Sequence, residues 1–166
     1  MKMKDIIDPI PLETLKSELT EEKFIRKTNK GGNMIYIVKA SDSPNVMKEI
    51  GRLRELSFRN AGGGTGKDCD VDEYDSGAFE YKQLIVWDPD EQAILGGYRF
   101  FICDKTNCML NGKVNLATSK LFNFSDTFVK EYLPYMIELG RSFVQPKYQS
   151  TGLRRKGIYA LDNLWD

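Results

Sequence analysis

The chain has 166 residues, of which 41% are hydrophobic and 29% are charged, as in a soluble domain with one core of ordinary size. Its 24 basic and 24 acidic residues cancel, so bulk charge gives no support for nucleic-acid binding, and no apolar run reaches the length of a membrane span. Histidine is absent, which removes the commonest general base and the commonest metal ligand, so we expect no metal site.

The N-terminus and the cysteines both favour a cytoplasmic protein. The start, MKMKDIIDPIP, has two lysines but no apolar core behind them, unlike a secretory signal. Cys69, Cys103 and Cys108 lack the paired spacing of a zinc site, and we interpret them as reduced thiols.

The chain is predicted to begin with an N-terminal extension, residues 1–32, that carries short helices at 11–19 and 20–27. A strand is predicted at 34–40, where the residues are mostly apolar and β-branched. The stretch 43–61 then predicts a helix, because it starts with Ser-Pro and repeats apolar residues at helical spacing.

The middle of the chain alternates loops with a hairpin. Residues 62–77 are glycine-rich and then acidic, and we interpret them as a mobile loop whose acidic part is an ion-pair hub, because the signatures of a phosphate loop and of an EF-hand are both missing. Strands at 81–88 and 93–104 are predicted to form a hairpin. Residues 105–125 are predicted to be irregular and 125–133 to form a short helix.

The last part of the sequence predicts a strand at 135–144, a loop at 145–157 and a helix that begins in 157–166. The pattern stops inside that helix, whereas a sheet with a helix just begun normally has a further strand to follow. We therefore expect the sequence to be the N-terminal portion of a longer protein.

Two predicted strands are unusual. The stretch GGYRF places two glycines in a strand, which implies close approach of another backbone or a ligand. Arg99 follows in the same stretch and, taken alone, suggests an exposed position on the surface of the hairpin. In ELGRSFV a regular strand would place Glu138 and Arg141 on opposite faces. The simpler interpretation of this stretch is a half-buried strand with an internal ion pair. A β-bulge at Gly140 would instead bring both to one face, splay the strand from its neighbour and free backbone amides for a ligand or a developing oxyanion.

Together these stretches resemble the acyl-carrier-protein-dependent N-acyltransferases of the acetyltransferase-like (GNAT) superfamily. The resemblance is to the haemolysin-like branch, which makes ornithine or glycine lipids and is related to the N-acyl-homoserine-lactone synthases. It implies an α/β (α+β) fold for residues 33–166, with a mixed, mostly antiparallel sheet flanked by helices and an incomplete C-terminus. It rests on an ordered set of residues: Arg54, Phe58, Asp72, Asp75, Arg99, Glu138 and Arg141.

The resemblance implies a role for each of these side chains. Arg54, Asp72, Asp75 and Arg141 would form a charge cluster that orders the loop over the donor site. Phe58 would line the path of the pantetheine or the acyl chain.

Three further roles follow from the resemblance. Glu138 would be the base, acting directly or through water, and Arg99 would stand near the acceptor or the hairpin edge. The backbone around Gly140 would pair with the pantetheine and stabilise the oxyanion. Arg99 and Arg141 are equal candidates for binding a carboxylate of the acceptor.

The segment QSTGLRRKG departs from the pyrophosphate loop of acyl-CoA-dependent relatives. Gln149 and Gly152 match the start of that loop, but Arg154 stands where its second glycine would be. The departure favours acyl carrier protein over CoA, because Arg154 and Arg155 could meet the phosphate of a carrier-bound pantetheine or the acidic carrier itself. The alternative is a basic helix start on the surface.

The function that this resemblance implies is transfer of a (3-hydroxy)fatty acyl group from acyl carrier protein to the α-amine of glycine or ornithine, in amino-acid lipid biosynthesis. The acyl-phosphopantetheine donor is a substrate, and no permanently bound cofactor is expected. One alternative is an N-acyl-homoserine-lactone-synthase-like enzyme, which would need an aromatic adenine site. Another is a non-catalytic acyl- or carrier-binding domain, which would have no need of Glu138 on an irregular strand.

Two expectations concern partners. Apolar residues in the N-terminal segment allow a peripheral contact with the inner membrane, although a helix packed on the core is the preferred interpretation. The open edge of an incomplete sheet would also allow pairing with a second chain, including a second copy.

Overall fold

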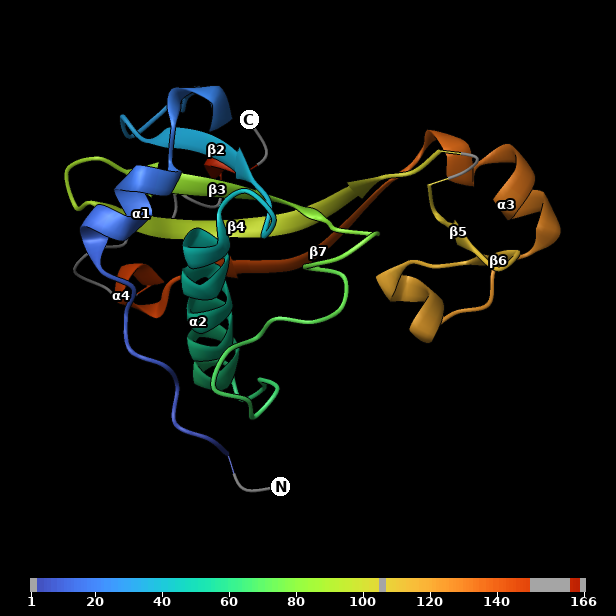
Figure 1. Ribbon diagram of the computed structural model, residues 1–166, viewed down its shortest axis with the longest axis horizontal. Helices are drawn as coiled ribbons and strands as arrows, with labels where there is room; N and C mark the ends of the chain where they lie inside the picture. The colour runs from blue at the N-terminus through green and yellow to red at the C-terminus, as the bar shows by residue number, and fades with distance from the viewer. Residues whose placement is uncertain (1–2, 105–106, 150–161, 165–166) are drawn as a thin grey trace.

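The structure is a computed structural model, described for residues 3–104, 107–149 and 162–164. Its main sheet has five strands in the order β1-β2-β3-β4-β7, and neighbouring strands are antiparallel (Figure 1). The predicted sheet flanked by helices is therefore confirmed. The strands are β1 (Phe24–Lys27), β2 (Met34–Val38), β3 (Lys82–Asp88), β4 (Ala93–Ile102) and β7 (Ile137–Val144).

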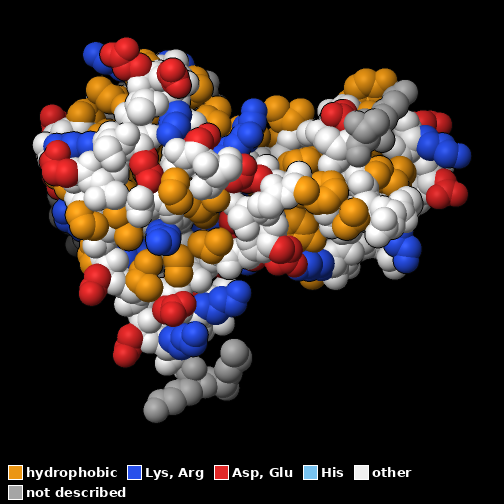
Figure 2. Space-filling model, in the orientation of Figure 1, with side chains coloured by type: hydrophobic (Ala, Val, Ile, Leu, Met, Phe, Trp, Pro, Cys, Tyr) orange, Lys and Arg blue, Asp and Glu red, His pale blue; other side chains and the backbone are white. Residues whose placement is uncertain are grey.

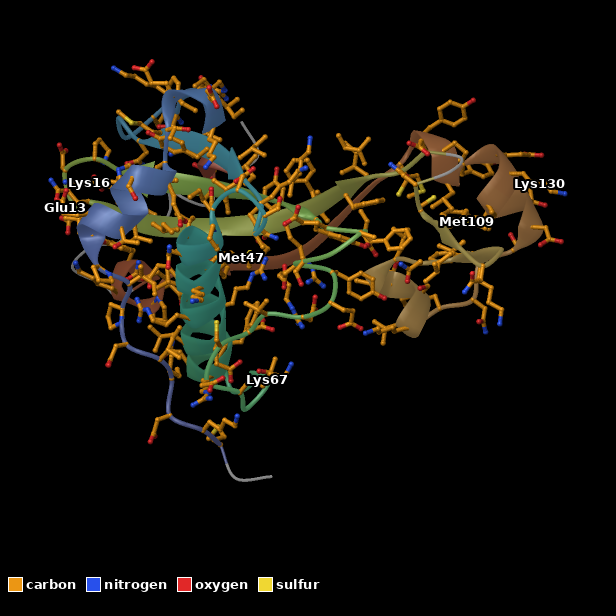
Figure 3. All side chains as sticks on the ribbon, viewed as in Figure 1. Glu13, Lys16, Met47, Lys67, Met109 and Lys130 are labelled. Atoms are coloured by element: carbon orange, nitrogen blue, oxygen red, sulfur yellow. The ribbon has the colours of Figure 1, made fainter. Side chains whose placement is uncertain are left out.

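Helices α1 (Leu12–Glu18) and α2 (Pro44–Asn60) cover one face of the sheet (Figure 1). Helix α2 presents an apolar stripe because Val46, Ile50 and Leu53 recur every three to four residues, and all three are buried against the strands. Figure 3 labels Met47, which belongs to the same core.

The start of α2 is capped from another helix. Ser43 stands at the N-cap position but makes no side-chain hydrogen bond to the helix. The Glu18 carboxylate at the end of α1 accepts instead from the amides of Asn45 at 2.9 Å and Val46 at 2.8 Å. This satisfies donors that a helix start leaves unpaired, and it ties the N-terminal segment to the body.

The opposite face of the sheet carries a smaller core. Tyr148 of α4 (Pro146–Gln149) and Leu164 are buried there against Val86, Leu95 and Val144. The predicted loop at 145–157 thus starts with a short helix, and its residues from 150 onward lie outside the described part. No helix in the described ranges is long and apolar enough to cross a membrane.

The predicted helix at 20–27 is wrong. A 3-10 turn, η1 (Glu21–Lys23), leads into β1, which pairs with β2 along the sheet edge. The helix-forming residues of the turn favoured a second helix, but the pairing of β1 with β2 overrides that local preference.

A small lobe, residues 103–104 and 107–136, stands at the far end of the paired β4 and β7 (Figure 1). The segment predicted to be irregular contains the hairpin β5 (Met109–Leu110) and β6 (Lys113–Val114) and the 3-10 turn η2 (Ala117–Lys120). It is followed by α3 (Asp126–Glu131) and η3 (Leu133–Tyr135). Ser125 caps α3, since the Phe128 amide donates to Ser125 Oγ at 3.2 Å.

The lobe buries little apolar surface of its own. Its core combines Cys103, Cys108, Leu116 and Leu133 with two tyrosines, Tyr74 and Tyr81, that come from outside the lobe. Figure 2 shows hydrophobic side chains gathered on its surface. Leu121, a residue of the lobe, is 77% exposed. The lobe therefore depends on its contact with the body of the protein.

The loop between α2 and β3, residues 61–81, is fastened to the helix rather than loose, in contrast to the predicted mobile lid. The Glu55 carboxylate accepts from the amides of Thr65 and Gly66 at 2.9 and 2.8 Å. Farther along, the Asp70 amide donates to the Gly51 carbonyl, and a Cβ at Gly51 would lie 2.5 Å from Cys69 Sγ. The close packing at Gly51 brings the acidic part of the loop to the sheet.

Candidate active site

A β-bulge brings Glu138 and Arg141 to one side of β7. Gly97 of β4 pairs with Phe143 of β7, and Arg99 pairs with Gly140. The stretch of β7 between these two pairs is therefore one residue longer than the stretch of β4 opposite it, which defines a bulge. Arg141 adopts a φ of 53°, which residues other than glycine rarely take. The predicted bulge is confirmed, with the left-handed residue at Arg141 rather than at Gly140.

The predicted splaying of the two strands is limited to the bulge, because pairing resumes at Arg99 with Gly140. The glycines of β4 permit close approach of another backbone, as expected. That backbone is the one of the neighbouring strands, β7 and β3. A Cβ at Gly96 would lie 2.5 Å from the Phe143 carbonyl oxygen, and one at Gly97 would lie 2.5 Å from that of Leu84.

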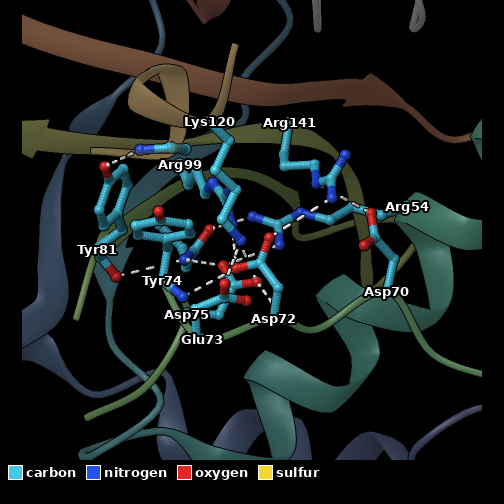
Figure 4. A network of polar contacts seen from close by, with 12 residues as sticks. Arg54, Asp70, Asp72, Glu73, Tyr74, Asp75, Tyr81, Arg99, Lys120 and Arg141 are labelled. Atoms are coloured by element: carbon cyan, nitrogen blue, oxygen red, sulfur yellow. Dashed lines mark hydrogen bonds and ion pairs between the residues drawn. The ribbon is translucent and has the colours of Figure 1, made fainter. Parts of the chain in front are cut away.

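A buried cluster of opposite charges lies next to the bulge (Figure 4). Arg54 contacts Asp75 at 3.0 Å, and neither side chain is exposed to solvent. Arg99 contacts Asp72 at 2.7 Å and Asp75 at 3.2 Å through Nη1. The predicted cluster is confirmed and gains Arg99, whose side chain is only 5% exposed, so a surface position for this residue is wrong.

The charges of this cluster stabilise one another. Burial lowers the pKa of Arg54, and the charge of Asp75 opposes that effect. For Asp72, burial raises the pKa, but the hydrogen bond and charge of Arg99 outweigh it and hold the pKa below its usual value. Moving or removing one of these side chains would leave the charge of its partner buried without compensation. The cost of that change holds the side chains in place.

Arg141 is held more loosely than the other two arginines. Its Nε lies 3.3 Å from Asp70 and its Nη2 lies 3.5 Å from Asp72, and its side chain is 34% exposed. Asp70 itself is buried, and burial raises its pKa despite the opposing charges of Arg141 and Arg54. Arg141 is therefore the arginine of the cluster that a ligand could reach.

Arg141 lines two cavities. The first, which we call the catalytic cavity, has a volume of 310 Å³ and is lined by Tyr81, Thr118, Leu121 and Glu138 among others. The second, which we call the glycine-loop cavity, has a volume of 290 Å³. Its other lining residues are Phe58, Ala61, Gly63, Gly64 and Thr65.

The Glu138 carboxylate accepts hydrogen bonds from two separate parts of the chain. Oε1 accepts from the Thr118 amide at 2.8 Å and from Thr118 Oγ1 at 2.5 Å. Oε2 accepts from the Tyr81 hydroxyl and from the Ala117 amide at 3.2 Å. Burial and the hydrogen bond to Glu138 raise the pKa of Tyr81, so the phenol stays protonated and donates.

Sequence reasoning missed the residues that hold Glu138. Thr118 lies in a stretch without helical or strand periodicity, and Tyr81 was read only as the first residue of a strand. Lys120 was also missed; it lines the catalytic cavity and pairs with Glu73 at the surface (Figure 4). A polar residue in an irregular segment gives no signal of the distant carboxylate that it contacts.

The remaining predicted site residues divide into two groups. Phe58 lies at the glycine-loop cavity, and the Gln149 side chain donates to the Val144 carbonyl at the end of β7. Gly152, Arg154 and Arg155 lie outside the described residues. Within the described ranges, no three metal-ligating side chains form a group that could hold an ion.

Comparison with known proteins identifies the family of the chain. Residues 53–155 match the acetyltransferase (GNAT) domain. The chain is 59% identical over 164 residues to a glycine N(alpha)-acyltransferase of Phocaeicola vulgatus, and 57% identical over 164 residues to one of Bacteroides thetaiotaomicron. These alignments cover 99% of this chain but 50% and 49% of the relatives, so the chain spans about half the length of the curated relatives it matches. No solved structure gives a significant match.

Proposed function

This chain belongs to the acetyltransferase (GNAT) domain family, and from that premise we propose that the protein is an N-acyltransferase. It moves a (3-hydroxy)fatty acyl group from acyl carrier protein to the α-amine of a small amino acid, in amino-acid lipid biosynthesis. Glycine is the acceptor we propose, because both similar proteins are named glycine N(alpha)-acyltransferases. The observation that carries the proposal is the position of Arg141 between two cavities, one of which contains a carboxylate, Glu138.

The two cavities suit the two substrates. The glycine-loop cavity, with Phe58 and the fastened glycine loop in its wall, would take the end of the pantetheine arm and its thioester. The catalytic cavity would take the amino acid, because it holds a base and a cation. The thioester carbon and the amine would meet beside Arg141.

The reaction needs a base because the α-amine of an amino acid is mostly protonated at neutral pH. Glu138 takes that proton directly or through a water. The amine nitrogen then attacks the thioester carbon, a C–N bond forms and the C–S bond breaks. The nitrogen loses a second proton to become the amide, and the carrier thiolate takes up that proton. Backbone amides at the bulge are the donors we propose for the tetrahedral oxyanion.

The carboxylate of the acceptor distinguishes the two candidate arginines. Arg99 already shares Nη1 between Asp72 and Asp75, and its guanidinium lies 5.6 and 5.2 Å from the ring centres of Tyr74 and Tyr81. Arg141 has longer contacts with its aspartates and is partly exposed. We therefore assign the acceptor carboxylate to Arg141, whose planar guanidinium can bind it with two hydrogen bonds.

The carrier protein as donor is part of this proposal. It depends on the basic pair Arg154 and Arg155, in place of a full pyrophosphate loop, and on the acidic character of carrier proteins. A comparison of the same acyl group on carrier protein and on CoA distinguishes the two donors.

The test uses the protein at full length with 3-hydroxyacyl carrier protein and, separately, 3-hydroxyacyl-CoA. Mass spectrometry follows release of the free thiol as glycine, ornithine and other amino acids are added in turn. We expect release that depends on glycine, is faster with the carrier, and is lost in Glu138→Gln. The matched control is Glu131→Gln, because Glu131 is an exposed carboxylate at the end of α3. Absence of release with every amino acid would refute the proposal.

A further inference from the structure

The lobe reaches the catalytic cavity through η2. Ala117, Thr118, Lys120 and Leu121 line that cavity, although the sequence predicts residues 105–125 to be irregular. Among them, Thr118 makes the most direct contact with the proposed chemistry, because its amide and its hydroxyl both donate to Glu138 Oε1.

We propose that Thr118 is a positioning residue for Glu138, so that the lobe supplies part of the acyl-transfer machinery. This inference rests on the proposed function, because it takes Glu138 as the base. Thr118 acts through Glu138 and needs no contact with either substrate.

The case for positioning starts from the flexibility of a glutamate. Its side chain rotates about three bonds, so the strand that carries Glu138 does not fix the carboxylate. The two donors of Thr118 fix one oxygen, and Tyr81 with Ala117 fix the other. Because Tyr81 precedes β3 and Thr118 belongs to the lobe, the carboxylate is held from two sides.

The turn that carries Thr118 is itself held in place. Ser119 Oγ donates to the Leu116 carbonyl at 2.6 Å, and the Tyr74 hydroxyl donates to the same carbonyl at 3.1 Å. The Leu116 side chain is 3% exposed and belongs to the lobe core. These contacts place the donors of η2 before any substrate binds, as a preorganised site requires.

The test compares three threonine variants of the full-length protein. Thr118→Val keeps the shape and removes the hydroxyl, Thr118→Ser keeps the hydroxyl, and Thr127→Val makes the matched change at an exposed position of α3. We expect Thr118→Val to lower kcat about tenfold, the scale of one hydrogen bond to a charged group, with both KM values within about twofold of wild type. Thr118→Ser should restore most of kcat, and Thr127→Val should leave it unchanged.

A second measurement does not depend on activity. Thermal unfolding is followed for Thr118→Val, Glu138→Gln and the double variant, and we expect the double variant to lose less stability than the two single losses combined. Additive losses, or an unchanged kcat in Thr118→Val, would overturn the inference. If the wild type acylates no amino acid, the proposed function fails, and the unfolding cycle alone decides whether Thr118 holds Glu138.

Discussion

The buried charge cluster and the catalytic cavity both contain arginines that contact aspartates, but these arginines differ in exposure. In the cluster, Arg54 and Asp75 are completely buried and lie 3.0 Å apart. In the cavity, Arg141 remains 34% exposed and lies 3.3 Å from its nearest aspartate. The comparison indicates that burial, rather than residue type, separates the arginines that hold the fold from the arginine that can bind a ligand.

The largest effect is expected when a member of the buried cluster is removed. Arg54→Met keeps the volume of the side chain but leaves Asp75 without its main cation. We expect a loss of about 3–5 kcal/mol in the free energy of unfolding, measured by urea denaturation. Lys16→Met changes an exposed ion pair with Glu13 on α1 and should have a much smaller effect. Equal losses in the two variants would contradict the structural role of the cluster.

Glu55 extends the comparison to acid stability. Burial raises the pKa of this carboxyl, but hydrogen bonds from Thr65, Arg59 and Gly66 outweigh burial and lower it from 4.5 to about 2. The folded-state pKa is depressed, so the stabilisation is fully present above pH 4.5 and is lost as the pH falls toward about 2.

We expect this single group to contribute up to about 3 kcal/mol to the loss of stability over that window. Glu55→Gln should make the melting temperature fall less steeply below pH 4.5, whereas the exposed Glu131→Gln should follow the wild-type curve. A wild-type slope in Glu55→Gln would show that the loop is held by other contacts.

Gly51 tests whether the packing of the loop on α2 is required. An added Cβ would lie 2.5 Å from Cys69 Sγ and 2.7 Å from Val71 Cγ2. Gly51→Ala should therefore destabilise the fold by about 1–2 kcal/mol, even though alanine favours a helix. At Gly63 the nearest atom to an added Cβ would be 3.5 Å away, so Gly63→Ala is the stability control. Urea denaturation of both variants measures the difference, and a stabilised Gly51→Ala would rule out the close packing.

The smallest expected effect on stability belongs to Arg141. Arg141→Gln removes the cation that we assign to the carboxylate of the acceptor, so the KM for glycine should rise about tenfold or more. The melting temperature should fall less than in Arg54→Met, because the Arg141 side chain is partly exposed and its ion pairs are long, but the buried Asp70 loses its ion-pair partner and the fall should be measurable. Arg99→Gln should lose activity together with stability. If Arg141→Gln left the KM for glycine unchanged, the assignment of the carboxylate would be wrong.

The parts of the site that could be predicted are those where the sequence conflicts with a regular strand. Glu138 and Arg141 could not share a face of an ordinary strand, which pointed to the bulge near Gly140. Four members of the charge cluster, Arg54, Asp72, Asp75 and Arg141, followed from a family resemblance, because the arginines lie far from one another and from the acidic loop in the chain and give no local signal of their pairing. The structure adds Arg99 and Asp70.

Other features depend on contacts between distant segments. The strand β1 gains its pairing from β2, and its preceding helix-forming residues concealed it. The Thr118 contact depends on how the lobe folds back over β7, which no periodicity in residues 105–125 revealed. The glycine loop suggested mobility, but a single buried carboxylate, Glu55, fastens it.

The most direct test of the acyl-transfer proposal is the initial rate of N-acylglycine formation from 3-hydroxyacyl carrier protein, measured for the full-length wild type and for Glu138→Gln. We predict that the wild type forms N-acylglycine and free carrier thiol in equal amounts. The rate in Glu138→Gln should fall by about 10²- to 10⁴-fold, the range for loss of a general base, while the protein stays folded. A folded Glu138→Gln variant that forms N-acylglycine at the wild-type rate would contradict the assignment of this carboxylate as the base.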